Sequence, residues 1–104
     1  MLIELLYFDG CPSWLVGLDN LKAALKAEGL EAQVRLVKVE DDKYAERLKF
    51  LGSPSYRVNG VDLWPEVRQQ DNLSCRVYNT PGGMKGVPTV DMLREQLRIS
   101  HEED

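Results

Sequence analysis

The chain begins with an almost unbroken apolar run at residues 2–8, which Glu4 alone interrupts. A strand that is covered on both faces has this pattern, because neither of its faces contacts water. Asp9 and Gly10 then stop the run, as turn residues do. The pattern therefore predicts a strand inside a sheet, followed by a turn.

From Ser13 the apolar positions change to the period of a helix, and Gly29 is suited to end that helix in a left-handed conformation. Residues 31–39 then alternate between apolar and polar. This alternation predicts a second strand with one polar face, which suits the edge of a sheet. The apolar residues of the predicted helix are Trp14, Leu18, Leu21 and Leu25.

The rest of the chain is predicted to form a helix, two strands and a final helix. An acidic cluster at residues 40–42 favours the start of a helix through the helix dipole, and Gly52 is expected to stop that helix. Strands are predicted at 55–58 and 75–79, with a long loop at 61–74 between them. A final helix follows a glycine- and proline-rich connection, with its apolar positions at Val90, Leu93 and Leu97.

The predicted order of elements is β-α-β-α-β-β-α, which is an α/β fold with a four-stranded mixed sheet flanked by helices. We expect one domain over residues 1–104. The first strand–helix–strand unit predicts a parallel pair with a right-handed crossover. The expected strand order is second-first-third-fourth, with the third and fourth strands antiparallel to the first two. The first and third helices are expected on one face of the sheet and the second helix on the other.

Composition and charge narrow the classes of function. The 104 residues are 43% hydrophobic and 29% charged, which is ordinary for a soluble globular protein. A formal charge of −4 argues against nucleic acid or an anionic membrane as the partner. No segment approaches the roughly 20 apolar residues of a membrane span, and the N-terminus lacks the pattern of a signal peptide. A cytoplasmic location with reduced thiols is the default expectation.

Two residues stand at positions where a known fold places its site. Cys11 lies at the junction of the first predicted strand and helix, and Pro54 immediately precedes the third strand. This arrangement resembles the thioredoxin fold, in which a cis-proline before the third strand faces the helix that bears the active cysteine. The resemblance implies a cis bond before Pro54, whereas the Ser-Pro pair by itself would be read as an ordinary trans proline in a loop.

More narrowly, the chain resembles a group of small bacterial thioredoxin-like proteins that are sometimes labelled as related to alkylmercury lyase. The likeness covers nearly the whole chain. Its motifs are Cys-Pro-x-Trp, Ser-Pro-x-x-x-Val-x-Gly and Ser-Cys-Arg-x-Tyr. In this sequence they are "CPSW" at 11–14, "SPSYRVNG" at 53–60 and "SCRVY" at 74–78.

Cys11 is the expected functional thiol. At the start of a helix it would meet free amide groups and the positive end of the dipole, which favour a thiolate, while Asp9 would oppose this. We expect its side chain to be partly open to solvent, with Pro12 at the first helical position. Trp14 stands where redox-active thioredoxins carry their second cysteine, so their dithiol cycle is excluded for this helix. The alternative is that Cys11 is a small buried hydrophobe.

Cys75 is expected to be a buried residue of the fourth strand. If strands 55–58 and 75–78 pair antiparallel, Cys75 lies four strand residues, or about 13 Å, away from Pro54. The Cα atoms of a disulfide must approach within about 7 Å, so this register excludes a bridge to the first helix. The long loop 61–74 leaves another register open, in which Cys75 is a second thiol within reach.

Four further residues require weighing. Gly82 and Gly83 stand where glutaredoxin-like proteins hold the carboxylate of glutathione, and their amides could bind an anion; a turn that only connects is the simpler interpretation. Trp64 is expected to plug the core rather than cover Cys11. His101 stands alone in a polar tail, so a zinc site is not expected. No cofactor is expected either.

The sequence is compatible with three functions. In the first, Cys11 attacks the disulfide of a protein or of glutathione, an external thiol resolves the adduct, and Pro12, Trp14, Ser53 and Pro54 dock the substrate. In the second, a thioredoxin-fold module without catalytic activity uses the same face to bind a peptide or protein. In the third, the thiol binds a soft metal such as mercury. The oligomeric state does not follow from the sequence.

Overall fold

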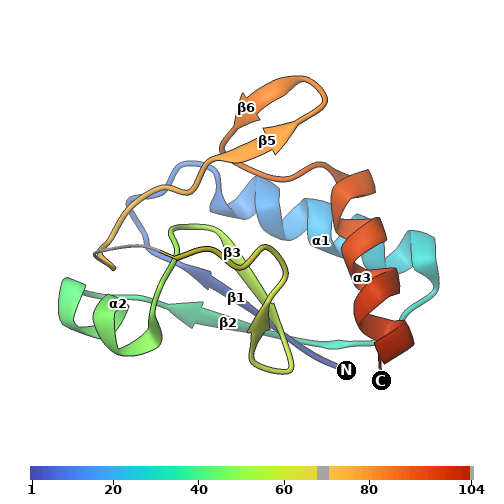
Figure 1. Ribbon diagram of the computed structural model, residues 1–104, viewed down its shortest axis with the longest axis horizontal. Coiled ribbons are helices and arrows are strands. Elements are labelled where there is room, and N and C mark those ends of the chain that lie inside the picture. Colours follow the sequence, from blue (N-terminus) through green and yellow to red (C-terminus); the bar gives the residue numbers. More distant parts are fainter. Residues whose placement is uncertain (68–70, 104) are drawn as a thin grey trace.

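A computed structural model describes residues 1–67 and 71–103 of the chain. Its elements form a mixed α/β fold with a four-stranded mixed sheet, a separate two-stranded hairpin and three helices (Figure 1). Along the chain the elements are β1 (Leu2–Tyr7), α1 (Trp14–Glu28), β2 (Gln33–Lys38), α2 (Asp42–Leu48), β3 (Ser55–Val58), β4 (Val61–Asp62), β5 (Tyr78–Thr80), β6 (Gly83–Lys85) and α3 (Val90–Glu103).

The four-stranded sheet has the order β2-β1-β3-β4. β1 and β2 are parallel, with Leu2 opposite Gln33 and the register continuing to the ends of both strands. β3 runs antiparallel to β1, with Leu6 opposite Ser55. The apolar first strand is therefore internal and the half-polar second strand lies at an edge, as their patterns predicted.

The helices cover the sheet in two layers, as predicted. α1 and α3 pack together on one face, and α2 lies against the other (Figure 1). No helix within the described residues is long and apolar enough to cross a membrane. The core cluster beneath α1 and α3 includes Ile3, Leu5, Leu21, Tyr56, Leu93 and Leu97. The cluster on the face of α2 contains Leu6, Val39, Ala45 and Phe50.

The helix ends follow local chemistry. Gly29 ends α1 with φ 64°, as predicted. The side chain of Asp41 accepts a hydrogen bond of 2.8 Å from the N–H of Tyr44 and so caps the start of α2. α2 ends at Lys49, which adopts φ 55°, so the expectation that Gly52 ends this helix is wrong. Gly52 serves a different purpose, because a later segment of the chain lies directly on it.

The fourth strand is not the predicted one. Asn59 and Gly60 both have positive φ, 51° and 86°, and turn β3 directly into β4. Two successive residues with positive φ are typical of a tight hairpin turn. Since β4 is antiparallel to β3, it runs parallel to β1, and the expectation that it would oppose the first two strands is wrong.

The segment predicted as the fourth strand, 75–79, contributes to a different structure. Its C-terminal part belongs to β5, which pairs antiparallel with β6 in a hairpin outside the main sheet (Figure 1). The predicted loop 61–74 begins with β4, and its residues 68–70 lie outside the described residues. The chain directly after this hairpin lies close to the residue before α1: a Cβ atom on Gly86 would lie 2.9 Å from the hydroxyl oxygen of Ser13.

Candidate functional site

The turn that carries Cys11 is held at both ends. The N–H of Cys11 donates to the carbonyl of Phe8 at 3.1 Å. The rings of Tyr7, at the end of β1, and Trp14, at the start of α1, stack with centroids 3.9 Å apart. Such aromatic pairs add about 0.5–1.5 kcal/mol to the burial of their area. Trp14 also packs against the core, as its place on the helical stripe predicted.

Cys11 is buried, with 3% of its surface exposed, so the expectation that it is partly open to solvent is wrong. Its Sγ donates a hydrogen bond of 3.4 Å to the carbonyl oxygen of Ser53. α1 begins at Trp14 and its cap residue is Ser13, so Cys11 precedes the helix. The thiol therefore donates a hydrogen bond to a carbonyl. The sequence had predicted instead that its sulfur would accept hydrogen bonds from free amide groups. Pro12 beside it is exposed and also lies before the first helical residue.

The bond between Ser53 and Pro54 is cis, as predicted. The ring of Pro54 lies against α1 at Gly17, where an added Cβ atom would come within 2.8 Å of the proline Cγ. The hydroxyl of Tyr56 donates to the carbonyl of Gly17 at 3.0 Å. Because Gly17 has no side chain, β3 and the loop that carries Pro54 can approach α1 closely. Cys11 meets this loop through the carbonyl of Ser53.

The backbone of Ser53 is occupied by the protein's own chain. Its N–H donates to the carbonyl of Ser74 at 2.8 Å, and its carbonyl accepts from the N–H of Arg76 at 3.0 Å. These two bonds form an isolated parallel bridge between Ser53 and Cys75. An added Cβ atom on Gly52, whose φ is 109°, would meet the backbone of Arg76 at 3.0 Å. The expected docking of a substrate on the backbone of Ser53 is therefore blocked by the segment 74–76.

Cys75 is exposed and lies next to Cys11, so the expectation of a buried residue in the fourth strand is wrong. Partial burial raises the pKa of Cys75, and the charge of Cys11 and a hydrogen bond between the two side chains raise that pKa further. Both cysteines are free thiols. The predicted separation between Cys75 and Pro54 is wrong because β3 pairs with β4 and not with the segment 75–78. The segment 74–76 pairs instead in parallel with Ser53.

Arg76 anchors this segment in the protein interior. Only 3% of its side chain is exposed, and its guanidinium group forms an ion pair of 3.0 Å with Asp62 of β4. The same group donates to the hydroxyl of Ser55 at 3.1 Å and to the carbonyl of Trp64, and it lies 5.0 Å from the ring centre of Tyr78. Removing one partner of a buried ion pair typically costs about 3–5 kcal/mol. The position of Cys75 is therefore set by its neighbour in the chain.

Aromatic residues fill the space beneath this segment. The ring of Trp64 meets those of Tyr56 and Tyr78 edge-on, with centroids 6.2 and 5.3 Å apart. Trp64 thus plugs the core, as predicted. Burial raises the pKa of both tyrosines well above the ordinary value, so both hydroxyls stay protonated and donate to backbone carbonyls.

Gly82 and Gly83 lie in the turn between β5 and β6. The hydroxyl of Thr80 accepts from the N–H of Gly82 at 3.2 Å and donates to the carbonyl of Gly83 at 2.6 Å. The amide of Gly82 is thus used within the turn. β6 follows before α3 begins, so the glycines do not stand at a helix start as an anion site of the glutaredoxin kind requires. This geometry favours the connecting turn.

Asp9, in the turn before Cys11, forms an ion pair with a lysine that is distant in the sequence. Lys38 Nζ lies 2.7 Å from its carboxylate, and this hydrogen bond, with the charge of Asp9, raises the pKa of Lys38. The parallel register places Lys38 opposite Tyr7 and so beside the turn. The sequence does not reveal this ion pair, because Lys38 is close to Asp9 in the fold but distant along the chain.

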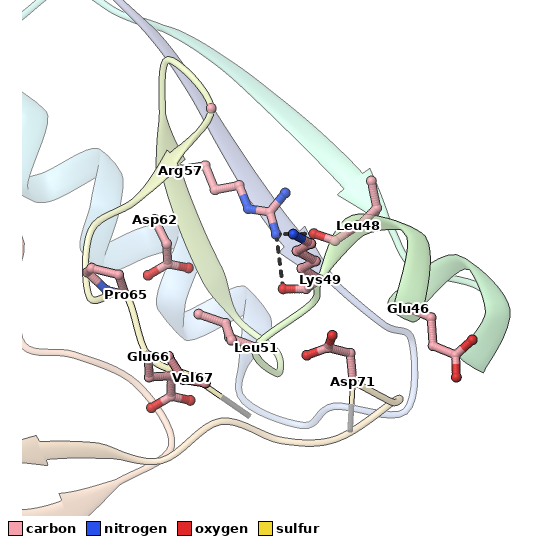
Figure 2. A pocket seen from close by; sticks show the side chains of 11 residues that line it. Glu46, Leu48, Lys49, Leu51, Arg57, Asp62, Pro65, Glu66, Val67 and Asp71 are labelled. Carbon is pink, nitrogen blue, oxygen red and sulfur yellow. Dashed lines mark hydrogen bonds between the residues drawn. The ribbon is translucent and has the colours of Figure 1, made fainter. Parts of the chain in front are cut away.

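A cavity of about 590 Å³ lies between α2, β3 and β4 (Figure 2). Arg57 on its wall donates to the carbonyls of Leu48 and Lys49, at 2.5 and 3.3 Å, and thereby holds the end of α2. Asp62 on the same wall is the partner of Arg76. Neither cysteine lines this cavity, and two of its charged groups already stabilise the fold.

No family model matches this chain, and no curated protein or solved structure matches it either.

Proposed function

We propose that this protein is a thioredoxin-like thiol–disulfide oxidoreductase whose redox couple is formed by Cys11 and Cys75. One observation carries the proposal: two thiols from distant parts of the chain interact beside the carbonyl of Ser53. The thioredoxin-like fold is supported by the strand order, by the parallel β1–β2 pair, by the antiparallel β3 and by the cis-proline before β3.

The chemistry is a two-electron exchange. When the couple is reduced, the cysteines carry two thiols; when it is oxidised, they form one disulfide and have released two electrons and two protons. Thiolate attack on a disulfide sulfur passes through a mixed disulfide, which a second thiol must resolve. With Cys75 beside Cys11, the second thiol lies in the same chain. This couple replaces the scheme in which an external thiol resolves an adduct on Cys11.

The substrate is a disulfide, either of a protein or of a low-molecular-weight thiol. An external dithiol then reduces the Cys11–Cys75 disulfide back to two thiols. The direct test is the reduction of a peptide disulfide with dithiothreitol as the electron donor, followed by separation of the reduced and oxidised peptides. We expect the wild-type protein to accelerate this reduction, and we expect Cys11→Ser and Cys75→Ser each to return it to the uncatalysed rate.

Asn79→Ser is the matched control, because Asn79 is exposed on the same segment as Cys75 and carries no thiol. This variant is expected to keep the wild-type rate. Retention of the full rate by both cysteine variants would refute the proposed couple.

A further inference from the structure

The two thiols differ in their access to solvent. Cys11 has 3% of its surface exposed, whereas Cys75 is exposed. Exchange between a thiol and a substrate disulfide requires that the attacking sulfur reach the substrate sulfur, so the rate depends on access. This difference assigns unlike roles to the two cysteines.

The difference is built into the segment that carries Cys75. Side chains alternate between the two sides of an extended chain, and here Arg76 and Tyr78 point into the core. Cys75 and Val77, the latter 57% exposed, therefore face outward. The ion pair between Arg76 and Asp62 holds this orientation, so Cys75 remains at the surface.

The surroundings of Cys11 have the opposite effect. The carbonyl of Ser53 accepts from its thiol, and the segment 74–76 is bonded across the same residue. Within the described structure, Cys11 is thus buried beside its partner thiol, and an external disulfide meets Cys75 first. A buried thiol beside an exposed one is suited to the second step of exchange.

From this geometry, and resting on the proposed function, we infer that Cys75 is the catalytic thiol that exchanges with the substrate and that Cys11 resolves the mixed disulfide. In the first step the Cys75 thiolate attacks one sulfur of the substrate disulfide. A bond forms between Cys75 and that sulfur, the substrate bond breaks, and one substrate thiolate leaves.

In the second step the Cys11 thiolate attacks the sulfur of Cys75. The bond between Cys11 and Cys75 forms, and the second substrate thiolate leaves. The couple has lost two electrons to the substrate, and the two protons from the cysteines end on the substrate thiols. An external dithiol reduces the new disulfide by the reverse sequence.

The order of labelling tests this assignment. Reduced wild-type protein is treated with a small amount of iodoacetamide, and the labelled peptides are mapped by mass spectrometry. Cys75 is expected to react faster than Cys11 by on the order of tenfold, because access limits the alkylation of a buried thiol. Equal labelling, or labelling of Cys11 first, overturns the assignment.

The reaction with 5,5′-dithiobis(2-nitrobenzoate) separates the assignment from the function. Wild-type protein is expected to release two equivalents of thionitrobenzoate and to end as the internal disulfide. Cys11→Ser is expected to release one equivalent and to retain the adduct on Cys75. If wild type releases two equivalents but Cys11→Ser gives no adduct while Cys75→Ser does, the function stands and the assigned roles fall. If wild type retains two adducts and forms no internal disulfide, the proposed function falls, and with it the resolving role of Cys11.

Discussion

At the scale of single residues, the reactivity of Cys75 depends on its contact with Cys11. Its pKa is raised above that of a free thiol by partial burial, by the charge of Cys11 and by their hydrogen bond. Only the thiolate is alkylated, so we expect the alkylation rate of Cys75 to reach half its maximum at a higher pH than that of a free thiol. In Cys11→Ser this midpoint should fall but stay above that of a free thiol, because the largest cause, burial, remains.

The measurement is the rate of alkylation of Cys75 against pH in both proteins, read by peptide mass. A midpoint that is the same in wild type and Cys11→Ser would contradict the contact between the thiols. The same pKa shift makes the stability of the folded protein depend on pH. Since folding raises the pKa of Cys75, its protonated thiol favours the folded state below the pKa of the unfolded chain. This contribution is lost as the pH rises through the folded-state pKa.

The sequence could name the residues of the site but not their contacts. Cys11 and Pro54 were identified by their places at element junctions, and the cis bond was predicted correctly. The burial of Cys11 could not be predicted, because the segment that covers it comes from residues 74–76. Arg76 belongs to the Ser-Cys-Arg-x-Tyr motif, but its role depends on an ion pair with Asp62 that no local pattern reveals.

At the scale of elements, the approach of α1 to β3 depends on Gly17. Replacing an exposed helical glycine by alanine usually stabilises a protein, by about 0.5–1 kcal/mol. At Gly17 the new Cβ atom would lie 2.6 Å from the hydroxyl oxygen of Tyr56 and 2.8 Å from Cγ of Pro54. Overpacking of this kind typically costs about 1–3 kcal/mol. We therefore expect Gly17→Ala to lower the free energy of unfolding, as measured by urea denaturation.

Ala23→Gly provides the matched control, since Ala23 is exposed on the same helix. There the preference is reversed, and alanine is expected to be more stable than glycine by about 1 kcal/mol. If Gly17→Ala raises the free energy of unfolding, the close packing of the proline loop on α1 is contradicted.

Elements with a long periodic pattern were predicted well, and short ones were not. β1, α1 and α3 each carry enough apolar positions to fix both their type and their buried face. β4 has two residues and no period of its own, and only the Asn59–Gly60 turn before it indicates a hairpin. Without a hairpin at this turn the fourth strand is expected at 75–79, and this expectation places Cys75 in the wrong part of the molecule.

At the scale of the whole molecule, the candidate site joins three distant parts of the chain. The turn after β1 supplies Cys11, the loop before β3 supplies Ser53, and the segment before β5 supplies Cys75. The ion pair of Arg76 with Asp62 links that last segment to the main sheet. Such a site is a property of the complete fold, and for this reason the order of elements could be predicted more fully than the site.

The central claim is that Cys11 and Cys75 form one redox couple within a single chain, and the mass of the oxidised monomer tests it most directly. Mild oxidation is followed by intact mass measurement, and the linked peptides are then mapped without reduction. We predict a monomer that has lost two hydrogens and carries a Cys11–Cys75 bridge, and Cys75→Ser should show no such loss. A monomer that retains both free thiols, or that oxidises only by linking two chains through Cys75, would contradict the claim.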